Sequence, residues 1–257
     1  MEFDILLCSL FFFIFGLFIG SFLLVVADRM IRDETFFKGR SYCEQCKHTL
    51  SYWDLVPLFS FLFLHGTCRY CKVKLSYYYP LSELLTGFVF LLVYLTIGTS
   101  SLPQLFFYVY IASSLLVIFL ADIKYGIIPD KIVYPALFFT LLFQVMTNTS
   151  LLMHYIFSSI GAGGFFLSLF VITKGRGMGF GDVKLAVLMG LLLGFPSIIY
   201  ALYIAFLTGA FVSLILILWR KKEIKSTIPF GPFLVFGTSI VLFFPQFVDN
   251  IVMKVLP

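Results

Sequence analysis

Eight long apolar runs constrain this chain more than any other feature of its sequence. They occupy residues of about 4–27, 81–98, 104–121, 132–147, 154–173, 183–196, 198–219 and 229–248. A helix needs roughly 20 apolar residues to cross the hydrocarbon core of a bilayer, whereas a transmembrane strand alternates apolar and polar residues. Only 12% of the residues are charged, against about 25% in an ordinary globular domain. The sequence therefore predicts an all-α polytopic membrane protein with about eight transmembrane helices.

The distribution of basic residues predicts how these helices are oriented. We place the N-terminus outside the membrane and let the chain cross eight times. The loops then expected on the cytoplasmic side are 28–80, 122–131, 174–182 and 220–228. They hold 16 of the 18 lysines and arginines, with Lys184 near the same face and Lys254 on the other side. This asymmetry follows the positive-inside rule. The net charge of +5 thus reflects topology and anionic membrane lipids, and it is poor evidence for a nucleic-acid partner.

Three parts are expected along the chain. Residues 1–27 form a first transmembrane helix, 28–80 a cytoplasmic loop, and 81–257 a helical bundle with short connections. The first run is not expected to be a cleavable signal peptide, because no basic residue precedes it and no small-residue cleavage site follows it. We find no internal repeat of the kind that transporters often show.

Four cysteines in the 28–80 loop have the spacing of a zinc site. Cys43 and Cys46 form one C-x-x-C pair, Cys68 and Cys71 form a second, and 21 residues separate the two pairs. Two such pairs can supply four thiolates to one tetrahedral zinc ion. A loop of this size has little core of its own, so a structural metal is physically expected. Disulfides or free thiols are the alternative, but a reducing cytoplasm disfavours disulfides.

Two aspartates stand at the ends of apolar runs. Asp122 ends the third run and Asp182 precedes the sixth, so the predicted topology puts both at the cytoplasmic face. A carboxylate at membrane depth is costly to ionise and commonly marks a functional site. Gly179 and Gly181 would let the backbone before Asp182 turn tightly and let another segment approach. Either aspartate alone could instead face interfacial water, and Asp182 could complement the N-terminal dipole of its helix.

Taken as a pair, Asp122 and Asp182 indicate an aspartic protease. Two close carboxylates cannot both ionise readily, so the pair retains a proton. The ionised member can then activate a water molecule, while the protonated member polarises the scissile carbonyl. A proton-coupled transporter is the alternative, although its acids would be expected nearer the bilayer midplane. A non-enzymatic membrane scaffold with a zinc module is a third interpretation.

Several motifs resemble those of the bacterial type IV prepilin peptidases, which are membrane aspartic proteases with a Gly-x-Gly-Asp motif. Residues 122–130, Asp-x-x-Tyr-x-x-Ile-Pro-Asp, resemble the first catalytic motif of the family. Residues 179–184, Gly-Phe-Gly-Asp-Val-Lys, resemble the second. The loop from 41 to 83 resembles the family at many positions, and residues 228–232, Ile-Pro-Phe-Gly-Pro, resemble its C-terminal signature.

The resemblance implies roles for particular residues. Asp122 and Asp182 would be the catalytic aspartates, and the four loop cysteines would bind a structural zinc ion. The supporting motif residues would be Gly179, Gly181, Pro129 and Asp130. The family cleaves the basic leader of prepilin and pseudopilin precursors at the cytoplasmic face of the bacterial cell membrane. The loop acids that could contact such a leader are Asp33, Glu34, Glu44 and Asp54. The 28–80 loop could instead form part of a methyltransferase and help bind its methyl donor.

Many members of this family also methylate the new N-terminal residue, using S-adenosylmethionine. Residues 20–26 resemble the first-helix signature of the family, but Leu24 stands where asparagine is usual. Asp28 and Arg29 follow where a tyrosine–arginine pair is common. No glycine-rich donor-binding loop of the soluble methyltransferase kind is present. The sequence therefore leaves the methyltransferase activity open.

Overall fold

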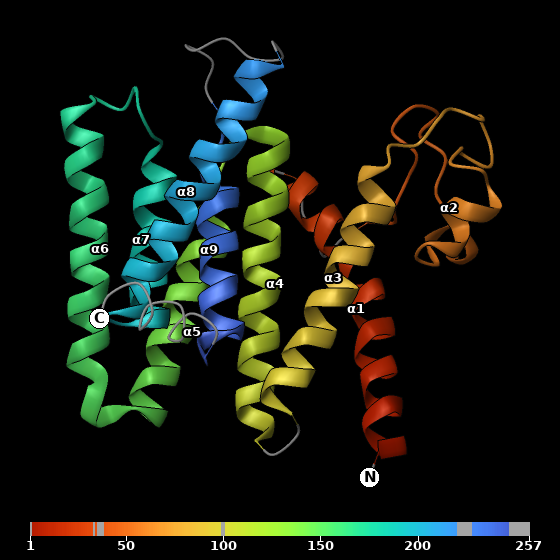
Figure 1. The fold of residues 1–257 in the computed structure, drawn as a ribbon. Coiled ribbons are helices and arrows are strands. Elements are labelled where there is room, and N and C mark those ends of the chain that lie inside the picture. Colours follow the sequence, from red (N-terminus) through yellow and green to blue (C-terminus); the bar gives the residue numbers. More distant parts are fainter. Residues whose placement is uncertain (1, 33, 35–38, 99–100, 220–227, 247–257) are drawn as a thin grey trace. The chain divides into compact units, whose positions relative to one another are not determined.

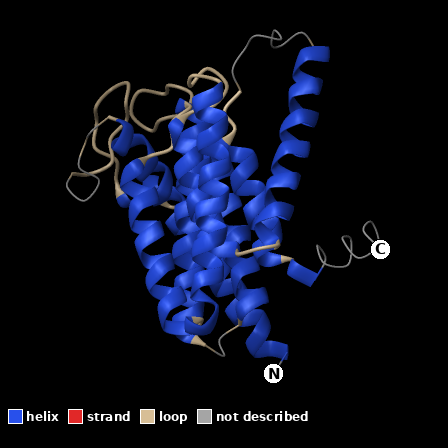
Figure 2. Cartoon of the chain, turned by 90° about the vertical axis from the view of Figure 1, so that its left-hand side faces the viewer, coloured by secondary structure: helices blue, strands red, loops and turns tan. Residues whose placement is uncertain are grey.

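The computed structural model describes residues 2–32, 34, 39–98, 101–219 and 228–246. Within these residues it contains helices and loops and no strand (Figures 1 and 2). Asp33 and Lys254 lie outside the described residues, as do positions 35–38 and 220–227 of the expected cytoplasmic loops and the last two positions of the eighth apolar run. The chain forms two compact units, residues 1–117 and 118–257.

A helix lies at each of the eight predicted apolar runs. These helices are α1 (Glu2–Ile31), α3 (Tyr78–Ile97), α4 (Leu102–Tyr125), α5 (Asp130–Thr147), α6 (Leu152–Ile172), α7 (Phe180–Leu193), α8 (Ser197–Leu218) and α9 (Gly231–Phe243). By length and hydropathy, α1, α3, α4, α6 and α8 can each cross a membrane. The prediction of an all-α, multi-pass membrane protein is therefore confirmed.

Several helices differ in extent from the apolar runs that predicted them, and α1 and α7 show why. Helix α1 continues past residue 27 to Ile31, because Asp28 and Arg29 remain helical and buried. Helix α7 begins at Phe180, before the run at 183, and it ends at Leu193. Gly194 stops it with a φ of +70°, a left-handed conformation that glycine adopts without strain. Hydropathy alone does not detect helical turns that contain polar residues or glycine.

In the first unit, α1 and α3 pack closely through small residues. A Cβ atom on Gly16 would lie only 2.8 Å from the Cα atom of Gly87, so the two backbones are nearly in contact. Membrane helices associate through such packing of small residues, because lipid provides no hydrophobic drive between them. On α3, Thr86 donates its hydroxyl to the Ser82 carbonyl at 2.8 Å and needs no partner from another helix.

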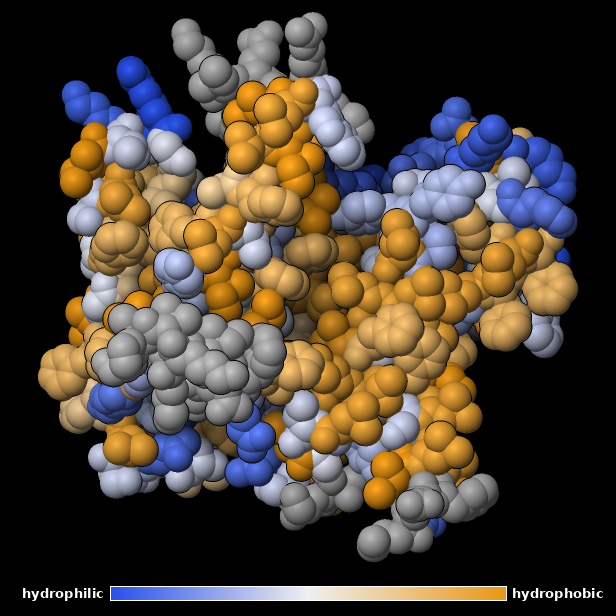
Figure 3. Space-filling model, in the orientation of Figure 1, coloured by the Kyte–Doolittle hydropathy of each residue, from blue (hydrophilic) through white to orange (hydrophobic). Residues whose placement is uncertain are grey.

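The segment between α1 and α3 is a polar loop that carries two short helices, η1 (Tyr52–Leu55) and α2 (Phe59–Phe63). Hydrophilic side chains gather over this loop in the space-filling view, and apolar ones cover the helices (Figure 3). The carboxylate of Glu83, near the start of α3, accepts the backbone N–H of Leu58 at 2.9 Å. This hydrogen bond ties the loop to the helix that follows it.

In the second unit, α7 is the central helix. Nine of its 14 residues are buried, and it packs against α5, α6, α8 and α9 (Figure 1). Two neighbouring helices donate side-chain hydrogen bonds to its backbone: Ser159 of α6 to the Val187 carbonyl at 2.8 Å, and Gln144 of α5 to the Leu191 carbonyl at 3.1 Å. These bonds hold α7 in a fixed register, and with it the residues of its first turn.

Candidate active site

Asp122 lies in the last turn of α4. The helix ends at Tyr125, because Gly126 takes a left-handed φ of +66° and donates its N–H to the Asp122 carbonyl at 2.8 Å. Asp122 is only 4% exposed. Its Oδ2 atom has no hydrogen-bond partner among the residues that the structure describes. A buried carboxylate oxygen without a donor is energetically unusual.

Asp182 lies in the first turn of α7, which begins after the N-cap residue Gly179. The backbone N–H of Gly179 donates to Oδ2 of Asp182 at 3.0 Å. An acidic side chain in the first turn is also favoured by the helix dipole. The capping role considered for Asp182 from the sequence is thus present. The residue is nevertheless only 6% exposed, more deeply buried than an ordinary capping side chain.

The two carboxyl groups line the same cavity, which has a volume of about 520 Å³. Its walls come from the turn after α4, the segment before α7 and the segment before α9. The charge on Asp122 acts on the Asp182 carboxyl, so the two groups are close enough to interact electrostatically. The structure therefore brings together the two aspartates that the sequence singled out. Two such groups in a poorly solvated site favour a state that shares one proton.

Glycines bring the backbone against this pair. A Cβ atom on Gly181 would lie 2.9 Å from Cβ of Ile128, and one on Gly231 would lie 2.5 Å from Oδ2 of Asp122. Gly181 was predicted as a site residue, but Ile128 and Gly231 were noted only as parts of motifs. Their contacts join segments about 50 and 100 residues apart in sequence, so spacing alone could not have revealed them.

The other two supporting residues lie at the start of α5. Pro129 is the N-cap residue of this helix, and Asp130 occupies its first turn. The Asp130 carboxylate forms an ion pair with Lys184 of α7 and is about half exposed. Lys184 lines the cavity, whereas Asp130 does not. Lys184 also lies over the Phe180 ring at 5.2 Å, a favourable cation–π arrangement.

The four loop cysteines form a second site, within the first unit. Their sulfur atoms all lie within 4.8 Å of one another, and those of Cys43 and Cys71 are 3.9 Å apart. None forms a disulfide. With Zn–S bonds of about 2.3 Å, sulfurs at the corners of a tetrahedron are about 3.8 Å apart. The arrangement therefore fits zinc, as the spacing predicted.

The two cysteine pairs have the same backbone geometry. Cys43 and Cys68 each donate a backbone N–H to the residue five positions later, at 3.0 and 2.8 Å. Lys47 and Lys72, each just after the second cysteine of a pair, adopt φ values of +56° and +58°. The backbone N–H of Cys46 donates to Cys43 and holds the pKa of that thiol at about 7, below its ordinary value. Such turns present thiolates to a metal.

Comparison with known proteins assigns the chain to a family. Residues 14–97 match the bacterial peptidase A24 N-terminal domain, and residues 109–214 match the type IV leader peptidase family. A prepilin leader peptidase/N-methyltransferase of Bacillus subtilis is 32% identical over 243 residues, which cover 90% of this chain and 96% of that protein. The chain belongs to the type IV leader peptidase family. The Aeromonas hydrophila relative of the same name is 31% identical, covering 90% of this chain and 88% of its own length. No solved structure matches the chain.

Each site lies within a region that the leader peptidase family shares. The cysteine cluster falls in the matched N-terminal domain, and both aspartates fall in the matched peptidase region. Gly231 lies beyond the matched 109–214 segment. Its contact with Asp122 comes from the structure.

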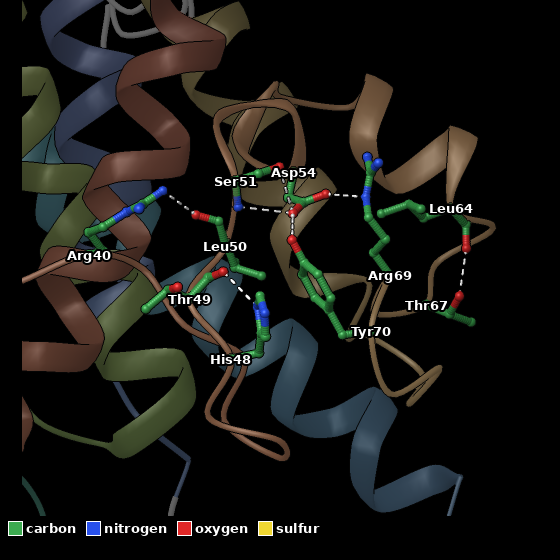
Figure 4. Close-up of polar contacts among 10 residues, drawn as sticks. All are labelled: Arg40, His48, Thr49, Leu50, Ser51, Asp54, Leu64, Thr67, Arg69 and Tyr70. Carbon is green, nitrogen blue, oxygen red and sulfur yellow. Dashed lines mark hydrogen bonds and ion pairs between the residues drawn. The ribbon is translucent and has the colours of Figure 1, made fainter.

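A polar network around Asp54 holds together the loop between α1 and α3 (Figure 4). Ser51 donates both its backbone N–H and its hydroxyl to Asp54 Oδ2, at 3.0 and 2.9 Å. Arg69 donates Nε–H to Oδ1 at 2.7 Å. Burial raises the pKa of Asp54, but the Ser51 hydrogen bonds and the Arg69 charge outweigh it, so the pKa lies below its usual range. Glu44 is likewise paired, with Arg32.

Proposed function

We propose that this chain is a membrane aspartic endopeptidase that cleaves the leader of type IV prepilin-like or pseudopilin-like precursors. Asp122 and Asp182 are the catalytic pair. The observation that carries the proposal is that two nearly buried carboxylates, from separate helices, line one cavity. Family membership supports the substrate class, because the relatives are named prepilin leader peptidases.

The geometry suits hydrolysis by a shared-proton pair. The ionised carboxylate removes a proton from a water molecule, and the water oxygen attacks the scissile carbonyl carbon. The protonated carboxyl gives its proton to the carbonyl oxygen as the tetrahedral intermediate forms. The C–N bond then breaks, and the leaving amine takes up a proton from the carboxyl that had activated the water. A hydroxyl proton of the intermediate returns to the other carboxylate as the new carboxyl group forms. The protonation states belong to the pair, because the two groups titrate together.

The proposed topology has eight membrane passes, with the N-terminus outside and the active site at the cytoplasmic face. Helices α5, α7 and α9 add three passes to the five that meet the length and hydropathy criteria. Asp122 at the end of α4, the first turn of α7 and the segment just before α9 line one cavity, as alternating passes require. In this scheme, residues 1–27 are the first transmembrane helix, 28–80 the cytoplasmic loop, and 81–257 the peptidase bundle.

The loop carries a structural zinc ion in this proposal. Cys43, Cys46, Cys68 and Cys71 would hold it, and the ion would cross-link the two turns of the loop. The donor set is complete without a water ligand, which is typical of structural rather than catalytic zinc.

A second activity, N-methylation of the new N-terminus, is proposed because the relatives' names include it. S-adenosylmethionine would be the methyl donor. Leu24 is 2% exposed within α1 and is an apolar core residue of the first unit. It cannot take over a hydrogen-bonding role of the asparagine usual in the family.

The test is co-expression with a prepilin-like precursor, with leader cleavage read by mass spectrometry. Asp122→Asn and Asp182→Asn are each expected to lower cleavage by about 10²-fold or more, because each removes an acid–base group. Asp4→Asn, an equal change at an exposed position of α1, serves as the control. The mass of the mature product shows whether a methyl group was added. Unchanged cleavage in either aspartate variant would overturn the mechanism and favour a transporter or scaffold.

A further inference from the structure

The first turn of α9 packs directly onto one of the two cavity carboxyls. A Cβ atom on Gly231 would lie 2.5 Å from Oδ2 and 3.1 Å from Cγ of Asp122. Real Cβ atoms essentially never approach another heavy atom closer than 3.0 Å. Any side chain at position 231 must therefore displace the Asp122 carboxyl or move the helix that carries it.

The backbone of this turn also supplies a hydrogen bond. The first N–H groups of a helix have no partner within the helix. In α9, Pro232 has no N–H, and the N–H of Phe233 bonds to the Phe230 carbonyl at 3.0 Å. The N–H of Gly231 remains, and it donates to the Asp122 carboxyl. Helix α9 thus directs a single N–H, with the positive end of its dipole, at this carboxyl.

Ile128 lies between the two glycine contacts. A Cβ atom on Gly181 would meet Ile128 at Cβ, Cδ1 and Cγ1, at 2.9, 3.3 and 3.4 Å. A Cβ atom on Gly231 would meet Ile128 Cδ1 at 3.2 Å, farther away than Asp122. The isoleucine is buried and follows Asp122 by six residues. It separates the end of α4 from the first turns of α7 and α9.

We propose that Gly231 and Ile128 are positioning residues for the aspartate pair. Gly231 holds the Asp122 carboxyl through its N–H and its missing side chain. Ile128 sets the spacing between the turn that carries Asp122 and the turn that carries Asp182. This inference rests on the proposed peptidase function and extends it to α9, which contributes no acid to the site.

The two glycine contacts differ in kind, and this difference makes the proposal testable. At Gly181 the three nearest atoms all belong to the Ile128 side chain, so removing that side chain removes them. At Gly231 the nearest atoms belong to Asp122, so removing the isoleucine side chain leaves the obstruction in place. The same second-site change should therefore rescue one glycine variant and not the other.

The experiment measures leader cleavage by purified full-length enzyme with a prepilin-like substrate. Gly231→Ala and Gly181→Ala are each expected to lower kcat by tenfold or more, with KM within about twofold of wild type. As a single change, Ile128→Gly should lower kcat. Added to Gly181→Ala it should raise kcat, whereas added to Gly231→Ala it should not. Gly161→Ala is the matched control, because a Cβ atom at that position of α6 would meet nothing within 4 Å.

Each outcome has a defined meaning. Wild-type kcat in Gly231→Ala would overturn the role of Gly231, and rescue of that variant by Ile128→Gly would show that it acts only through Ile128. If kcat falls further when Ile128→Gly is added to Gly181→Ala, the spacing role of Ile128 is overturned. Asp122→Asn is run in parallel: if it also cleaves normally, the proposed function itself has failed. If Gly231→Ala does not accumulate in membranes, Ile128→Val and Ile128→Ala decide the spacing role, because kcat should fall stepwise at constant KM.

Discussion

At the scale of single residues, Asp182 serves both its helix and the cavity. Its carboxyl accepts the N–H of Gly179, the N-cap residue of α7, and it also lines the space shared with Asp122. The helix-capping and catalytic interpretations of this aspartate are therefore compatible. The cap holds the carboxyl in one orientation, which a freely rotating side chain at a helix end would lack.

The two roles separate under substitution. Asp182→Asn keeps a side-chain oxygen for the Gly179 N–H, so we expect stability close to wild type and loss of cleavage. Asp182→Ala should lose cleavage and also about 1 kcal/mol of stability, as is typical for a lost cap. Thermal unfolding in detergent and cleavage assays measure the two quantities separately.

Asp130→Asn is the control for this pair of variants. Asp130 also lies in the first turn of a helix, but it is exposed and does not line the cavity. Its ion pair with Lys184 should contribute at most about 1 kcal/mol. Cleavage within a few-fold of wild type is expected, and a loss as large as that of Asp182→Asn would contradict the assignment of the pair.

At the scale of elements, the loop between α1 and α3 depends on polar contacts rather than on an apolar core. The Asp54 side chain is 3% exposed and is held by Ser51, Arg69 and Tyr70. Replacing it by asparagine should destabilise the loop by about 2 kcal/mol, because charge-assisted hydrogen bonds are lost. Limited proteolysis of the loop provides the measurement.

The pH dependence of this effect follows from the lowered pKa of Asp54. A lowered folded-state pKa gives stability that is present above the unfolded pKa of about 3.9 and is lost as pH falls through the folded value. The loss of loop stability caused by Asp54→Asn should therefore stay constant from about pH 5 to pH 8. If this loss of stability changed between pH 5 and pH 8, another group in the network would have to titrate there.

Zinc provides the second test of the loop. We expect one zinc ion per chain by elemental analysis, and Cys43→Ser or Cys68→Ser should abolish it, since both cysteines are buried in the cluster. Loss of metal should expose the loop to protease, as a structural zinc site contributes directly to folding. Cys8→Ser, in α1 and outside the cluster, should leave the zinc content unchanged.

Local patterns predicted the elements better than their contacts. Continuous apolar runs identify these helices because length and hydropathy are properties of each segment alone. The cysteine spacing likewise reports a local geometry, and the sulfur cluster agrees with it. The contact of Gly231 with Asp122 and the pairing of Lys184 with Asp130 depend on how distant helices pack. No spacing rule encodes such contacts, so only the structure reveals them.

At the scale of the whole molecule, the proposed topology predicts the side of each loop. Alkaline phosphatase fused after residue 98, 148 or 194 should be active, because this enzyme matures only outside the cytoplasm. Fusions after residue 126 or 175 should be inactive, and green fluorescent protein should give the reverse pattern. An active phosphatase fusion at 126 or 175 would place the aspartate cavity on the outer side and overturn the proposed orientation.

The lengths of α7 and α9 have a consequence for how water reaches the bilayer interior. At 1.5 Å per residue, their 14 and 13 residues span roughly 20 Å, whereas the hydrocarbon core is about 30 Å thick. If α7 and α9 cross the membrane as proposed, helices this short would lead the surrounding lipid to thin or the headgroup region to dip toward their ends. Both helices begin at the aspartate cavity. A depression in the membrane at this place would bring water to the carboxyl pair, so that a hydrolytic reaction could proceed on a substrate still held in lipid.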